Sequence, residues 1–226
     1  MTIRHYRLPV LIIVAVISLV FVYLVPPENY IIKSFFRVVA MGVILYYAFL
    51  QVPSKLKAIH ILILIGLSFS IIGDSIYYWP MFGFLIAPAA ILDGYIFYCI
   101  GFFTQIKFSL LRLLTIIPIA IFGYAIVPII FKSLDDNGKV LLIFAIIIYI
   151  LFIAIMCWAA FMTGNRWVMI AALLFVISDT VRVLNKHIFS VDYLDLLIIL
   201  SYYGAQFLIA HSVGTFTHKS KKIHPK

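Results

Sequence analysis

Three aspartates lie inside long apolar stretches of the sequence: Asp74, Asp93 and Asp179. An ionisable side chain within a membrane span is costly and usually faces a bundle interior or a wet cavity, so each is a candidate site residue. Two carboxyls that share a low-dielectric site do not both ionise readily, and can serve as an acid and a base. Such a pair suits hydrolysis through an oxocarbenium-like transition state. It equally suits proton coupling in a transporter.

Further polar residues are expected at the depth of Asp74 and Asp179. At about 1.5 Å per residue, these acids would lie roughly 25 Å and 18 Å from one membrane face, in the far half of the bilayer. Candidate supporting residues in the same half are Lys33, Arg37, Arg182, Tyr202, Tyr203 and Gln206. Two alternatives remain open. The acids could form an ion-pair network that only fixes helix packing, and Lys33 and Arg37 could snorkel to the interface.

The elements that position these residues are membrane helices, because the composition excludes a soluble domain. Of the 226 residues, 65% are hydrophobic and 11% charged, against roughly 45–50% and 25% in soluble domains. A span takes about 17–25 mostly apolar residues, and we expect eight in a single membrane domain, residues 1–226. The expected spans are 8–25, 32–50, 57–79, 82–104, 110–131, 139–161, 167–185 and 194–216. The runs are apolar throughout, which predicts an all-α polytopic bundle rather than a barrel.

The basic residues predict the orientation of the bundle. The net charge is +9, and eleven of the 17 Lys and Arg residues fall on the side of both termini, with six on the other. The positive-inside rule then predicts that both termini are cytoplasmic. We expect a multi-pass protein of a bacterial inner membrane that contacts membrane lipid and binds no nucleic acid. The sequence does not predict an oligomeric state.

Other chemistries have little support in the sequence. None of the six histidines forms a ligand motif with a nearby acid, and His211, inside the last span, is expected to be a packed interior side chain. No Gly-x-Ser-x-Gly elbow or phosphate-binding loop is present. We therefore expect no metal site and no cofactor. The aromatic residues at the end of the third span are expected to form an interfacial belt: Tyr77, Tyr78 and Trp79.

Four segments together resemble a known family. Residues 66–80 (GLSFSIIGDSIYYWP) and 172–185 (ALLFVISDTVRVLN) resemble the Gly-Asp and Ser-Asp motifs of the lysoplasmalogenase-like (YhhN) membrane family. Residues 202–212 (YYGAQFLIAHS) resemble its closing helix, and Lys33 stands where the family has a Lys at the start of its second span. The two Asp motifs are also similar to each other, which is compatible with a parallel duplication of four helices.

The resemblance implies eight spans and hydrolysis of the vinyl ether bond of lysoplasmalogens, giving a fatty aldehyde and a glycerophospho-ethanolamine or -choline. The motif acids correspond to Asp74 and Asp179, the expected catalytic residues, and the substrate would be a lysophospholipid. One departure concerns the fourth span, where the family has a His and this chain has Tyr95, with Asp93 two residues earlier. The alternative function is a proton-coupled carrier or flippase that uses the same acids.

Overall fold

The computed structural model describes residues 7–26, 28–80, 86–134, 140–185, 191 and 193–216, and all regular structure among them is helical. The expected all-α fold is confirmed. In chain order the helices are α1 (Arg7–Leu24), α2 (Tyr30–Leu50), α3 (Ala58–Ile76), α4 (Ile86–Phe103), α5 (Leu110–Leu113), α6 (Ile116–Leu134), α7 (Val140–Thr163), α8 (Arg166–Leu184), α9 (Tyr193–Ser212) and the short 3-10 helix η4 (Val213–Thr215).

Seven segments of the described chain are long and apolar enough to cross a membrane. They come from α2, α3, α4, α7, α8 and α9, and from the combined stretch Leu110–Pro128. Helix α1 corresponds to the first expected span, but its described apolar stretch, Arg7–Phe21, is shorter. The starts expected for the fourth and sixth spans, at 82 and 139, lie outside the described residues.

The fifth expected span is present as one apolar stretch, Leu110–Pro128, and its helix is broken near Pro118, where a proline within a span predicts a kink. Helix α5 ends at Leu113 and α6 begins at Ile116. Pro118 follows within one turn, and its missing N–H removes the helical bond to the carbonyl four residues earlier. The Thr115 hydroxyl instead donates to the Arg112 carbonyl at 2.6 Å, which satisfies an acceptor at the break.

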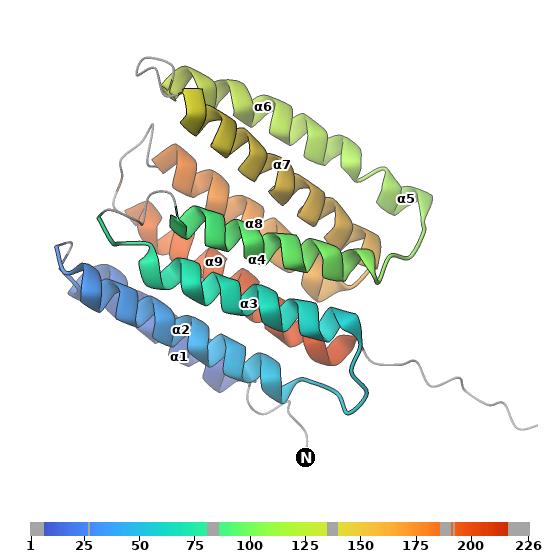
Figure 1. Cartoon of the computed structure of the whole chain (residues 1–226), viewed down its shortest axis with the longest axis horizontal. Helices are drawn as coiled ribbons and strands as arrows, with labels where there is room; N and C mark the ends of the chain where they lie inside the picture. The colour runs from blue at the N-terminus through green and yellow to red at the C-terminus, as the bar shows by residue number, and fades with distance from the viewer. Residues whose placement is uncertain are drawn as a thin grey trace, which may run out of the picture.

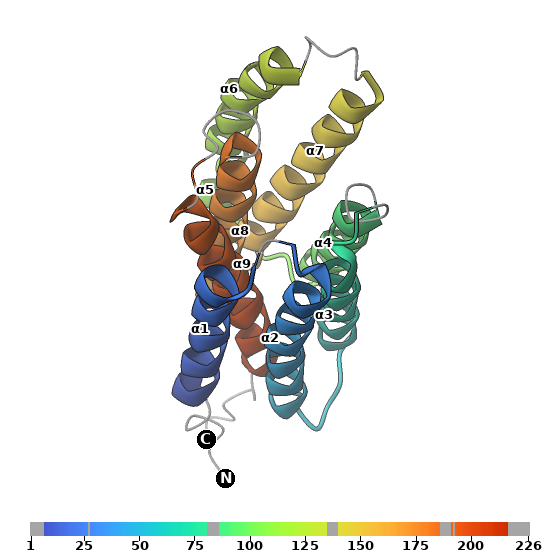
Figure 2. The same cartoon turned by 90° about the vertical axis from the view of Figure 1, so that its left-hand side faces the viewer.

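The helices run side by side along a common direction (Figure 1). Helices α6 and α7 form one edge of the bundle, and α1 and α2 lie towards the other (Figure 2). The closest pairs are α3 with α4 and α8 with α9, and α9 also contacts α1, α2 and α3. Helix α9 therefore lies at the centre of the bundle, and 72% of its apolar segment is buried.

Glycines allow α3 and α4 to approach closely. A Cβ placed on Gly66 would lie 2.4 Å from the Tyr98 ring and 2.9 Å from the Gly94 carbonyl oxygen. No side chain tolerates such contacts, so Gly66 lets the two backbones meet, as small residues do at membrane helix seams. The seam turns Asp74 of α3, together with Tyr95 and Tyr98 of α4, into the bundle interior, where all three are fully buried.

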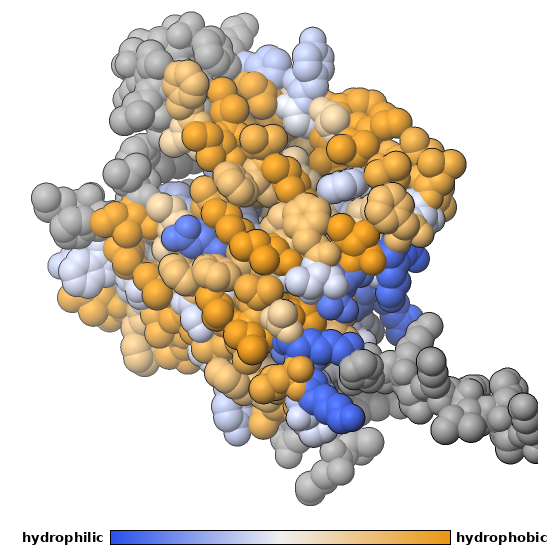
Figure 3. Space-filling view, turned by 45° about the vertical axis from the view of Figure 1, so that its right-hand side comes forward, coloured by the Kyte–Doolittle hydropathy of each residue, from blue (hydrophilic) through white to orange (hydrophobic). Residues whose placement is uncertain are grey.

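The outer surface is apolar along the helices and hydrophilic at one end. Figure 3 shows a largely hydrophobic side with hydrophilic residues gathered towards the end where α2 meets α3. Leucine, isoleucine and phenylalanine side chains stay exposed on all the long helices, for example Ile117 of α6 and Leu151 of α7. This pattern fits a bilayer as solvent. The assignment of one end to the cytoplasm stays a prediction from charge.

Candidate functional site

Asp74 lies near the end of α3 and forms a buried ion pair with Arg37 of α2. The Arg37 Nε donates to Asp74 Oδ1 at 3.1 Å, and the Arg37 Nη2 contacts the same oxygen. The carboxyl is fully buried, and Arg37 is 4% exposed. The second oxygen, Asp74 Oδ2, is buried without a hydrogen-bond partner among the described residues. An unsatisfied buried acceptor of this kind costs about 1–3 kcal/mol, so it calls for a functional explanation.

Asp179 lies on α8 and is held differently. Its Oδ2 accepts a hydrogen bond from the Tyr95 hydroxyl of α4 at 2.9 Å. Its Oδ1 lies 3.5 Å from Arg182 Nη1, one turn along the same helix. This arginine contact is longer than the one to Asp74, and the Arg182 side chain is 16% exposed. Asp179 is therefore positioned mainly by a neutral phenol.

Two aromatic rings join the acid–arginine pairs into one site. The Arg37 guanidinium carbon lies 4.4 Å from the Tyr77 ring centre and 5.9 Å from that of Tyr202. The Arg182 carbon lies 5.6 and 5.4 Å from the same two rings. Both arginines thus make cation–π contacts with shared rings. The two carboxyls expected to act together are brought to one place by α2, α3, α8 and α9.

The hydroxyls of Tyr202 and Tyr203 are also without partners. Both side chains are buried, at 1% and 3% exposure, and neither hydroxyl has a hydrogen bond to a described residue. The Tyr203 hydroxyl neighbours the Asp74 carboxyl, and the Tyr202 hydroxyl lies near Gln206.

A polar layer on the next turn supports this site. The Gln206 Oε1 accepts from the Tyr98 hydroxyl at 2.7 Å, and Gln206 Nε2 donates to Ser70 Oγ at 3.0 Å. The Ser70 hydroxyl in turn donates to the Gly66 carbonyl at 3.1 Å. These hydrogen bonds connect α9 to α3 and α4. They fix the position along the bundle of Tyr202 and Tyr203, which lie one turn before Gln206 on α9.

Lys33 marks the outer end of the site. It is partly buried one turn before Arg37 on α2, with its Nζ 5.0 Å from the Tyr78 ring centre and 5.8 Å from that of Phe21. Among the described residues no carboxylate forms an ion pair with Lys33. Its ammonium group is therefore a candidate partner for an anionic group.

Asp93 is not brought to this site. It lies on the exposed side of α4, and no hydrogen bond or ion pair joins it to a described residue. Tyr95 is two residues along and therefore on the opposite helix face, which is the face that packs inward. The prediction of Asp93 as a supporting residue is not matched by its position.

Comparison with known proteins identifies the family. The family model for the YhhN family matches residues 32–213, well over half of the chain. The chain belongs to the YhhN family. This is the family of lysoplasmalogenase-like proteins. No solved structure matches the chain.

In this YhhN protein, sequence reasoning missed two tyrosines. Tyr77 was expected in an interfacial belt, yet its ring contacts both site arginines. Its spacing of three residues from Asp74 places both on one helix face, and this signal was available. Tyr149 of α7 lies 6.0 Å from the Tyr95 ring, beside Asp179. Nothing in its apolar surroundings in the sequence distinguished it from a core residue.

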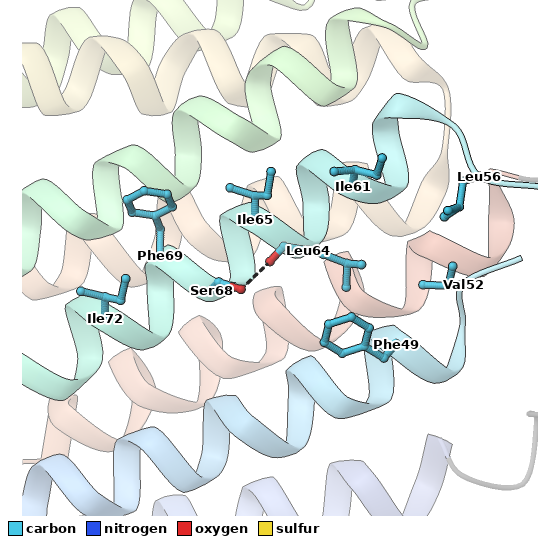
Figure 4. A pocket seen from close by; sticks show the side chains of 9 residues that line it. All are labelled: Phe49, Val52, Leu56, Ile61, Leu64, Ile65, Ser68, Phe69 and Ile72. Atoms are coloured by element: carbon cyan, nitrogen blue, oxygen red, sulfur yellow. Dashed lines mark hydrogen bonds between the residues drawn. The ribbon is translucent and has the colours of Figure 1, made fainter.

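A separate apolar groove runs along the outward face of α3, on the side away from Asp74. Figure 4 shows its lining from α2, α3 and their connection, and its only polar side chain, Ser68, is engaged with the Leu64 carbonyl at 2.9 Å. The groove offers hydrocarbon contact but no reactive group. In this YhhN protein the candidate reactive groups are therefore the two acids, Asp74 and Asp179. Among the described residues no group of three or more His, Cys, Asp or Glu side chains is arranged to hold a metal ion.

Proposed function

We propose that this protein is a membrane hydrolase that cleaves the vinyl ether bond of lysoplasmenyl-ethanolamine or -choline. The products are a fatty aldehyde and a glycerophospho-base. The observation that carries the proposal is the meeting of two buried, differently held carboxyls, Asp74 and Asp179, with the hydroxyls of Tyr203 and Tyr95 beside them. Membership of the YhhN family supports the same class of reaction. We further propose the inner membrane of a bacterium as its location.

The two acids are assigned different roles. Arg37 contacts Asp74 through two nitrogens, which favours the carboxylate form. Arg182 is 3.5 Å from Asp179, and Tyr95 is the shorter contact at 2.9 Å. We therefore assign proton donation to Asp179 and stabilisation of positive charge to Asp74.

The reaction then balances without any further group. Asp179 gives its proton to the vinyl carbon distal to the ether oxygen, which leaves an oxocarbenium ion at the adjacent carbon. The Asp74 carboxylate stabilises this cation. Water adds to the cationic carbon and returns a proton to Asp179, and the resulting hemiacetal breaks down to aldehyde and alcohol. The hydroxyls of Tyr202 and Tyr203, both buried near Asp74, are assigned to orient that water.

Lys33 is assigned to the lipid phosphate. It lies one turn beyond Arg37 on the same helix, which places it at the outer end of the site. An ammonium group pairs with phosphate as a charge-assisted contact. The proposed substrate thus lies with its headgroup near Lys33 and its vinyl ether near the acids.

The carrier alternative has less support. Carriers of this size commonly break their helices at the binding site. Helices α3 and α8 run without interruption through Asp74 and Asp179. No observation in the described residues favours transport over hydrolysis.

The test measures aldehyde release by the purified protein in detergent with lysoplasmenylethanolamine. Asp74→Asn and Asp179→Asn should each lower the rate by about 10²–10⁴-fold, the usual contribution of an acid–base group. Asp93→Asn is the matched control, because it removes a carboxyl within a span but outside the site, and it should keep the wild-type rate. Full activity in both site variants would sink the mechanism. Absence of aldehyde together with proton-dependent uptake into liposomes would favour the carrier.

A further inference from the structure

The end of the bundle where α1 begins and α9 ends carries only basic charge; we call it the basic end. The bases in its connections are Arg7, Lys55, Lys57, Lys107, Arg112 and Arg166. The eight acidic residues all lie elsewhere in the sequence: Glu28, Asp74, Asp93, Asp135, Asp136, Asp179, Asp192 and Asp195. The terminal segments 1–6 and 217–226 contain no acid either. In the part of the chain that the structure describes, no Asp or Glu side chain forms an ion pair with a base of this end.

Two arginines at this end lie in the neighbourhood of a buried histidine. His211 of α9 is 3% exposed, and both Arg7 of α1 and Arg166 of α8 are near enough for their charges to act on its ring. The Arg166 guanidinium carbon lies 4.9 Å from the Trp167 ring centre. That ring meets His211 edge-on, with ring centres 4.8 Å apart. The three basic residues therefore belong to one cluster built from α1, α8 and α9.

Tyr47 of α2 extends the cluster. Its hydroxyl is 3.0 Å from His211 Nδ1, and the Arg7 side chain reaches the same hydroxyl. The Arg7 Nε is buried and has no hydrogen-bond partner among the described residues. A buried guanidinium donor without an acceptor is costly, so the Arg7 Nε is a candidate donor to a bound anion.

We propose that Arg7 and Arg166 form a phosphate-binding site at the basic end, beside the buried His211 ring and separate from the two acids. A guanidinium pairs with phosphate through two parallel hydrogen bonds, and arginine is the preferred residue for such recognition. The ligand class is a phosphate group that carries net negative charge, either on an anionic lipid or free in solution. Arg166 is exposed, and Trp167 is partly buried. Both are typical of the headgroup level of a bilayer.

The experiment uses the full-length protein in detergent and measures retained lipid by native mass spectrometry during titration with phosphatidylglycerol. Galactosyl diacylglycerol, which has no phosphate, is the control lipid. The test variant is the double change Arg7→Gln with Arg166→Gln. The matched control is Lys55→Gln with Lys107→Gln, which removes the same charge from the same end. Lys55 and Lys107 are exposed lysines outside the cluster.

Wild type and the lysine control should retain phosphatidylglycerol alike, and the arginine variant should bind it about tenfold or more weakly. Equal binding by the arginine variant would overturn the proposal. Equal loss in the lysine control would also overturn it, because the attraction would then belong to the whole basic end.

A second arm separates the sources of the phosphate. Inorganic phosphate at millimolar concentration should displace the lipid and raise the unfolding temperature of wild type if free phosphate is the ligand. A lipid ligand predicts no such effect. Should the double variant fail to fold, the single change Arg166→Gln replaces it, because Arg166 is exposed and its loss opens no core. Unchanged lipid retention by that variant would count against the site. Aldehyde release plays no part in either measurement.

Discussion

Asp74 on α3 and Asp179 on α8 are both buried beside an arginine, but the two arginines come from different places. Arg37 reaches Asp74 from α2, so the pair joins two helices. Arg182 lies on the same helix as Asp179 and contacts it at 3.5 Å. The tie between helices at Asp179 is instead the neutral bond from Tyr95 of α4. One acid is thus fixed by charge and the other by a phenol, and the difference assigns them separate roles.

The largest expected loss of stability follows from breaking the ion pair between Arg37 and Asp74. Arg37→Met leaves the Asp74 carboxylate buried without its cation, and removing one partner of a buried pair costs about 3–5 kcal/mol. Arg182→Met should cost less than Arg37→Met, because the Arg182 contact is longer, at 3.5 Å, and Tyr95 still donates to Asp179. The measurement is the free energy of unfolding in detergent.

A double change sharpens this result. Arg37→Met combined with Asp74→Leu removes both charges and should recover most of the stability, because apolar replacement of a buried pair is often neutral. If Arg182→Met lowered the free energy of unfolding as much as Arg37→Met, the two ion pairs would contribute equally to stability. The proposed difference between them would then be wrong.

The different surroundings of Asp74 and Asp179 could be predicted only in part from the sequence. The apolar runs predict the helices, because a span needs length and hydrophobicity and little else. The spacing of Asp179 and Arg182 predicts that they share a face. The partner of Asp74 did not follow from spacing, since Arg37 is on another helix and its reach depends on how α2 packs against α3.

The sequence also did not predict which face of α4 turns towards the bundle interior. This helix is apolar on all sides, so no periodic pattern shows which side turns inward. Asp93 and Tyr95 were both candidates, and the contact of Gly66 with Gly94 determines that Tyr95 is the residue facing Asp179. The break in the fifth span is different, because Pro118 within an apolar run predicts a kink there, and α5 ends at Leu113 just before it.

The neutral tie gives the next effect in size. Tyr95→Phe leaves the buried Asp179 Oδ2 without its donor, and an unsatisfied buried acceptor costs about 1–3 kcal/mol. Aldehyde release should fall as well, because the proposed proton donor loses its positioning contact. Tyr98→Phe is the matched control: it removes a hydroxyl from the same helix, bonded to Gln206 at 2.7 Å. Its rate should fall less than that of Tyr95→Phe, and a larger loss in Tyr98→Phe would place the reacting group near Gln206 instead.

The smallest expected effects concern stability at two helix contacts, that of α3 with α4 and that of α8 with α9. Gly66→Ala places a methyl group 2.4 Å from the Tyr98 ring and 2.9 Å from the Gly94 carbonyl, and overpacking of this kind costs about 1–3 kcal/mol. Gly204→Ala, in the α8–α9 seam, meets only the Leu174 side chain at 3.5 Å, an ordinary contact. It should be neutral or stabilise by up to about 1 kcal/mol through helix propensity. Unfolding free energies of both variants test this, and equal destabilisation would mean that the two seams are packed alike.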